Sequence, residues 1–86
     1  MKLKKEFILR EIAGEYLLVP TGKTTLEFNG LITINELGAF IWNNINQVDS
    51  EGELLNRILN EYDVEESVAK KDLDEFLGKL KESEII

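Results

Sequence analysis

Residues 31–45, with the sequence LITINELGAFIWNNI, contain the point at which the chain changes from strand to helix. Residues 31–34 form a short apolar and β-branched run, which is typical of a strand. From Asn35 onward the apolar residues recur at i, i+3, i+4 and i+8, the spacing of one helical face. They are Leu37, Phe40, Ile41 and Ile45. With Asn35 as N-cap, the sequence predicts a helix over about 36–46 after a strand at 31–34.

The preceding residues predict a β-hairpin. Residues 7–12 are a β-compatible run, residues 13–15 have the composition of a turn, and residues 16–19 form a second run. Pro20 closes that run because it has no N–H to donate to a sheet. We therefore expect the strands of the domain to lie within residues 7–34.

A second turn is predicted at Asn29-Gly30, between residues 24–28 and the strand at 31–34. Both residue types tolerate positive φ, so the pair suits a type I′ turn. The pattern leaves open whether residues 24–28 are a true strand or an extended loop.

Two further helices are predicted after residue 50. Ser50 followed by Glu53 matches a capping box and begins a helix over 51–62. Asp63 followed by Glu66 repeats this signal and begins a helix over 64–83. The apolar stripe of this last helix has five members. They are Ala69, Leu73, Phe76, Leu77 and Leu80.

The outer surface of the last predicted helix carries two pairs of opposite charge at i, i+4, Lys70 with Asp74 and Glu75 with Lys79. Strands precede helices along the chain, without a linker or an internal repeat. This segregation predicts a single α+β domain over 1–86, with a three-stranded antiparallel sheet followed by a three-helix bundle.

The composition excludes several classes of function. The 86 residues contain no Cys and no His, which excludes disulfides, Zn sites with Cys or His ligands, Cys nucleophiles and Ser-His-Asp triads. A chain of this length cannot enclose a large cavity. The clustered carboxylates lack the spacing of a calcium loop, so no metal site is predicted. We therefore expect binding rather than catalysis.

The charge and hydropathy patterns bear on partners and location. Ten Lys and Arg against seventeen Asp and Glu give a net charge of −7, which disfavours nucleic acid as a partner. No apolar run is long enough for a membrane span or a signal peptide, so a cytoplasmic location and no membrane partner are expected.

The strand at 31–34 carries no charge or proline to block pairing at a sheet edge. Such an edge beside an apolar helix face is what strand addition by a peptide requires. Alternatively, the edge pairs with the N-terminal run or with a second copy of the chain. The pattern leaves these possibilities open, and with them the choice between monomer and homodimer.

Four stretches of the chain resemble the coenzyme PQQ synthesis protein D family, and these PqqD-like stretches cover nearly its whole length. They are residues 7–16, 28–42, 61–64 and 72–77. The most specific piece is 34–42, INELGAFIW, although the family more often has Thr in place of Leu37.

This resemblance implies a winged-helix-like domain that recognises the leader of a ribosomally made precursor peptide. Family members hold the leader as an added strand between the third strand and the third helix. They present it to a modifying enzyme, commonly a radical SAM maturase, without catalysis or a cofactor of their own. The product, a quinone cofactor or another modified peptide, is not implied.

Carried over by position, the backbone of the third strand would pair with the leader, and five residues of the last helix would face it. The strand residues are Leu31, Ile32, Thr33 and Ile34, and the helix residues are Lys70, Leu73, Asp74, Leu77 and Lys81. Leu73 and Leu77 would form the pocket floor, and Lys70 and Lys81 would contact leader carboxylates at the rim. A DNA-binding winged-helix regulator is the alternative function, because its topology is similar.

Overall fold

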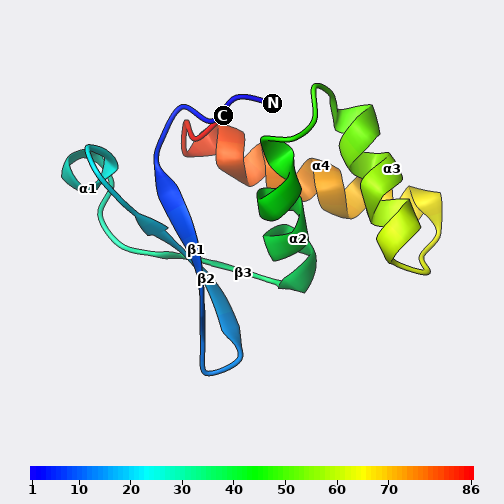
Figure 1. The fold of residues 1–86 in the computed structure, drawn as a ribbon, viewed down its shortest axis with the longest axis horizontal. Coiled ribbons are helices and arrows are strands. Elements are labelled where there is room, and N and C mark those ends of the chain that lie inside the picture. The colour runs from blue at the N-terminus through cyan, green and yellow to red at the C-terminus, as the bar shows by residue number, and fades with distance from the viewer.

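The computed structural model describes residues 1–86 and contains a three-stranded antiparallel sheet and four helices (Figure 1). The elements are β1 Phe7–Ile12, β2 Glu15–Pro20, α1 Thr24–Glu27, β3 Ile32–Ile34, α2 Glu36–Ile45, α3 Glu51–Glu61 and α4 Glu66–Glu82. The predicted α+β class is confirmed, because the three strands precede the three long helices along the chain. No helix has the length and apolar content needed to cross a membrane.

The β1–β2 hairpin turns at Ala13 and Gly14. Their φ angles are +52° and +81°, and Ile12 pairs with Glu15 across the turn. These values are those of a two-residue type I′ turn, which matches the right-handed twist of the strands. The predicted hairpin is confirmed.

The predicted type I′ hairpin at Asn29-Gly30 is wrong. Residues 24–27 form the short helix α1, and β3 pairs with β2 instead. The buried Thr24 hydroxyl accepts a 2.8 Å hydrogen bond from the Glu6 N–H, which holds the start of this otherwise exposed segment beside the start of β1. Of the two turn residues only Gly30 has a positive φ, +101°.

Two of the three long helices begin with a side-chain cap. The Asn35 side chain accepts from the Gly38 N–H at 2.8 Å, and the Ser50 hydroxyl accepts from the Glu53 N–H at 3.3 Å. The cap predicted at Asp63 is wrong, because α4 begins at Glu66 and its N-cap residue Glu65 makes no side-chain bond. The other predicted helix ends agree with the structure to within one residue.

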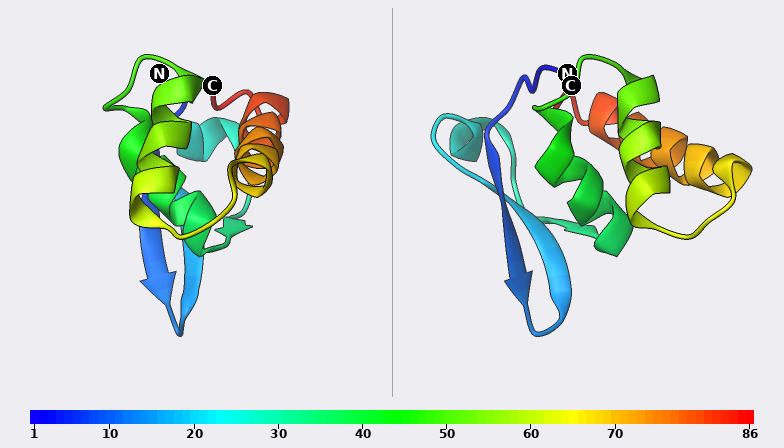
Figure 2. Two further views of the ribbon diagram at one scale, coloured as in Figure 1. Left: turned by 90° about the vertical axis from the view of Figure 1, so that its right-hand side faces the viewer. Right: turned by 45° about the vertical axis from the view of Figure 1, so that its right-hand side comes forward.

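The three long helices pack together on one face of the sheet, α1 lies apart from them, and the tip of the hairpin projects beyond them (Figure 2). The core between the layers contains apolar side chains from the sheet, from each long helix and from the C-terminal segment. Fully buried examples are Leu18, Ile41, Leu54, Leu73 and Ile85. The sheet therefore has one buried face and one face open to solvent.

Residues preceding β1 hold the C-terminal end of α4 in place. The Lys4 N–H donates to the Ile85 carbonyl at 2.6 Å, and Lys5 Nζ donates to the Ser83 carbonyl at 2.9 Å. The two chain ends are close together in Figure 1. This anchor fixes α4 beside the start of the sheet, so that the helix runs back along β3.

Candidate functional site

The third strand is an edge strand, because the order of strands in the sheet is β1-β2-β3. Residues that flank a two-residue turn are a hydrogen-bonded pair, and such pairs alternate along an antiparallel ladder. Since Ile12 and Glu15 flank the turn, the main-chain groups of Tyr16 and Leu18 point toward β3. Their partners there are Ile34 and Ile32.

The remaining main-chain groups of the third strand therefore point away from the sheet. The N–H and C=O of Thr33 lie between the two bonded positions and face outward. No backbone hydrogen bond outside the regular elements uses residues 31–34. The strand thus offers a donor and an acceptor to an additional strand.

The side chains of this segment divide between the two faces of the sheet. Ile32 and Ile34 are half-buried and pack against the core, whereas Leu31 and Thr33 are exposed on the other face. Leu31 is 57% exposed and precedes the regular strand. An added strand would therefore place alternate side chains toward the helices, on the same face as Ile32 and Ile34.

A groove of about 340 Å³ lies between the end of β3, the start of α2 and one flank of α4. Figure 1 shows β3 and α4 running in opposite directions. Apolar residues of the groove are Ile34, Leu37, Ile41 and Phe76. Its other lining residues are Thr33, Asn35, Gly38, Asp72, Glu75 and Lys79. The site combines exposed backbone, an apolar floor and charges of both signs.

The predicted strand residues lie at this site. Thr33 and Ile34 line the groove, Ile32 lies in the same edge strand, and Leu31 lies just before it. Their role in peptide binding remains a prediction, and the geometry makes Thr33 the residue whose main chain is best placed for it.

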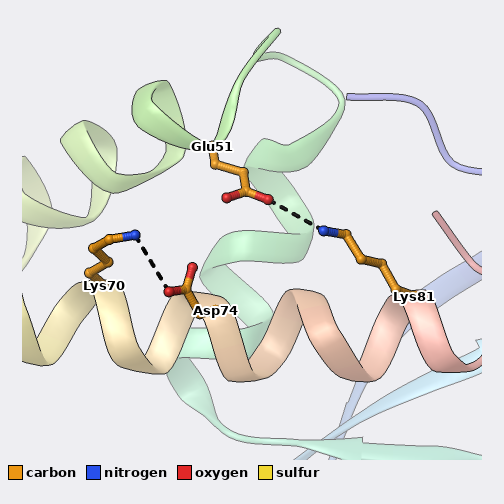
Figure 3. A network of polar contacts seen from close by, with 4 residues as sticks. All are labelled: Glu51, Lys70, Asp74 and Lys81. Atoms are coloured by element: carbon orange, nitrogen blue, oxygen red, sulfur yellow. Dashed lines mark hydrogen bonds and ion pairs between the residues drawn. The ribbon is translucent and has the colours of Figure 1, made fainter.

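The structure does not bring the predicted helix residues to the groove. Leu73 and Leu77 are 2% and 1% exposed and belong to the core. Lys70 pairs with Asp74 at 3.5 Å, and Lys81 pairs with Glu51 of α3 at 3.6 Å (Figure 3). These three charged residues therefore lie on the flank of α4 that faces α3.

Sequence reasoning missed the four residues that α4 contributes to the groove. They are Asp72, Glu75, Phe76 and Lys79. At 100° per residue, the apolar stripe of α4 has a polar flank on each side, one with positions 70, 74 and 81 and one with 72, 75 and 79. The helical period identifies both flanks, but it contains no signal for which of them faces β3.

The groove has the chemistry of a binding surface for an extended chain. The structure contains no group of three or more Asp, Glu, His or Cys residues that could hold a metal ion. Every buried side-chain polar atom has a hydrogen-bond partner. Strand edges bind through main-chain hydrogen bonds, and neighbouring pockets select side chains.

Tyr62, the residue that follows the last turn of α3, has a hydroxyl with a raised pKa. Burial raises the pKa of its hydroxyl above the usual value of 10.0, and the carboxylates of Glu36 and Glu61 raise it further. Its ring packs edge-on against Phe40 at 5.4 Å. Tyr62 does not line the groove, so this shift concerns stability rather than binding.

Comparison with solved structures finds the same fold in the structure titled "TbiB1 in Complex with the TbiA(beta) Leader Peptide". The TM-score is 0.74 at 24% sequence identity, and the match covers 99% of this chain and 93% of the TbiB1 chain. Comparison with curated proteins finds no match. Residues 15–86 match the family model described as Coenzyme PQQ synthesis protein D (PqqD), and the chain therefore belongs to the PqqD family.

Proposed function

We propose that this protein is a non-catalytic adaptor for precursor peptides. It captures the leader of a ribosomally synthesised precursor as a strand added to β3, and presents that precursor to a modifying enzyme such as a radical SAM maturase. The observation that supports this most is the unpaired edge at Thr33 beside the groove against α4. The PqqD-family match and the fold shared with a leader-bound TbiB1 chain also support it.

The expected affinity follows from the size of the site. Three strand residues offer few main-chain hydrogen bonds, each worth about 0.5–1.5 kcal/mol net, and the groove adds a small apolar contact. Small interfaces of this kind bind weakly. We expect a Kd of roughly 0.1–10 μM, which suits a protein that must release its peptide to an enzyme.

The test is a titration of ¹⁵N-labelled protein with synthetic leader peptides encoded by short reading frames beside this gene. We expect the amides of Leu31, Thr33 and the groove flank of α4 to shift. Shifts confined to α3 would refute the proposed site.

A second measurement separates strand addition from other modes of binding. Thr33→Pro removes the outward N–H without removing a bond to β2, whereas Thr33→Val keeps it. We expect at least tenfold weaker binding for the proline variant alone, with both variants folded by circular dichroism. Leader peptides N-methylated at alternate residues give an independent check, because one methylation frame should abolish binding to the unaltered protein.

Pairing of the edge with a second copy of the chain, and the alternative function of DNA binding, give different results. A homodimer through β3 would shift the amides of Leu31 and Thr33 on dilution, and the Leu31 shift would be absent in Thr33→Pro. DNA binding has less support, because the net charge is −7 and Lys70 and Lys81 of α4 are paired with carboxylates. Duplex binding at about 50 mM salt would favour the DNA alternative over ours.

A further inference from the structure

The three charged residues of the groove have no ionic partner within the protein. Asp72, Glu75 and Lys79 are exposed, and the ion pairs of the structure involve other residues. Glu75 and Lys79 stand at i, i+4, and the sequence predicts a pair there, but the structure contains none. By contrast, the charges on the opposite flank of α4 are paired (Figure 3). Groove charges are thus available to a bound peptide.

These charges are ordered along the groove. Because β3 and α4 run in opposite directions (Figure 1), the order of the sequence puts Asp72 and Glu75 nearer the end of the strand at Asn35 and Lys79 nearer its start. Phe76 stands between them and packs near Ile34. The groove therefore has an acidic end, an apolar centre and a basic end.

On the basis of the function proposed above, we infer that the groove selects peptides by the order of their charges. The recognised segment has a basic residue, an apolar residue two positions later and an acidic residue two positions after that. The basic side chain faces Asp72 and Glu75, the apolar one covers Phe76, and the acidic one faces Lys79.

The direction follows from the geometry of strand pairing. Antiparallel pairs have the straighter and somewhat stronger hydrogen bonds, so the peptide runs antiparallel to β3 and in the direction of α4. Its N-terminal part then lies beside Asp72 and its C-terminal part beside Lys79. A parallel peptide would require the opposite order of charges.

The distance between the charges along α4 also agrees with the spacing of alternate residues in an added strand. From Asp72 to Lys79 the helix rises roughly 10 Å at 1.5 Å per residue. Residues i, i+2 and i+4 of a strand share one face and span roughly 14 Å. Basic and acidic side chains are long enough to cover the difference of a few ångströms.

The test is a selection of random 12-residue peptides, displayed on phage, against the full-length protein at about 50 mM salt. We expect enrichment of the basic, apolar, acidic order at alternate positions. A selected peptide should bind about tenfold more tightly than the same peptide with its two charged residues exchanged, and this ratio should shrink at high salt. Exchanging the two charged residues leaves the composition and net charge of the peptide unchanged. General attraction of the peptide to an acidic protein therefore contributes equally to both affinities.

Two protein variants test whether the preference for charge order comes from the groove flank of α4. The triple variant Asp72→Lys, Glu75→Lys and Lys79→Glu should prefer the exchanged peptide. The control, Lys70→Glu with Asp74→Lys, reverses a pair on the other flank of the same helix and should keep the original preference. Both change only exposed positions, so both variants should fold, and circular dichroism is the check.

The outcomes separate this inference from the proposed function. Selected peptides that shift the Thr33 amide but show less than a twofold preference for charge order would overturn the inference and leave strand capture intact. Preference for the acidic residue first would overturn the antiparallel direction. Failure to select any peptide that shifts Thr33 would overturn the proposed function itself.

Discussion

The ring of Phe76 lies against the backbone of Gly38, so closely that a Cβ atom at position 38 would stand 2.9 Å from Cε1 of the ring. The same Cβ would stand 3.2 Å from Cβ of Ile34. Gly38 therefore allows α4, α2 and β3 to meet at one point, and that point is the floor of the groove. Its missing side chain sets how closely the three elements approach.

Replacement of Gly38 by alanine should change both stability and binding. The new methyl group pushes Phe76 away from α2, and overpacking of this kind costs about 1–3 kcal/mol, against a gain of about 1 kcal/mol in helix propensity. We expect a net loss of about 1 kcal/mol in the free energy of unfolding, measured with urea, and weaker peptide binding.

Gly78→Ala is the matched control. Gly78 also lies inside a helix, but a Cβ there would meet no atom within 4 Å. We expect this variant to gain about 0.5–1 kcal/mol and to bind peptide unchanged. Equal effects of the two substitutions would contradict the packing role of Gly38.

Truncation of Leu77 should behave as a core substitution. Leu77 is 1% exposed, so Leu77→Ala should lower the free energy of unfolding by about 2–5 kcal/mol. Lys81→Ala removes only the exposed pair with Glu51 and should cost less than about 1 kcal/mol. Thermal unfolding distinguishes them. Peptide affinity that falls with Lys81→Ala would return this residue to the binding site.

The side chain of Asn35 should be required for the start of α2. Asn35→Ala removes the acceptor for the Gly38 N–H, and the expected loss is about 1 kcal/mol. Asn35→Asp retains an acceptor oxygen and should remain within about 0.5 kcal/mol of the original protein. Urea unfolding of both variants is the measurement, and equal losses would show that the cap has no energetic role.

Tyr62 should make stability depend on pH in the alkaline range. Because its pKa is raised in the folded state, the folded protein retains the proton that the unfolded chain releases near pH 10. The stabilisation is present below pH 10 and is lost as the pH rises through the folded pKa. We expect urea unfolding to show a steeper loss of stability above pH 10 than in Tyr62→Phe, which keeps the ring against Phe40. Parallel pH profiles would contradict this.

The hydrophobic period located the hairpin at residues 7–20, the strand before Asn35 and the three long helices, because each pattern is local. It failed at residues 24–28, where the outcome depends on a hydrogen bond between the Thr24 hydroxyl and Glu6, eighteen positions away. It also failed at Asp63, since helix propensity allows several starting points and packing selects among them.

The amino-acid sequence by itself determined the α+β class, the likeness to the PqqD family and the unprotected strand at 31–34, since these depend on residue types and their spacing. Only the tertiary structure decided which flank of α4 faces β3. The apolar stripe is buried in either case. Hydrogen bonds from Lys4 and Lys5 hold the C-terminal end of α4 and so set how the helix crosses the core. This crossing places positions 72, 75 and 79 at the groove. The spacing of apolar residues determines which side of α4 is buried, but the direction in which the helix crosses the core depends on contacts with distant segments.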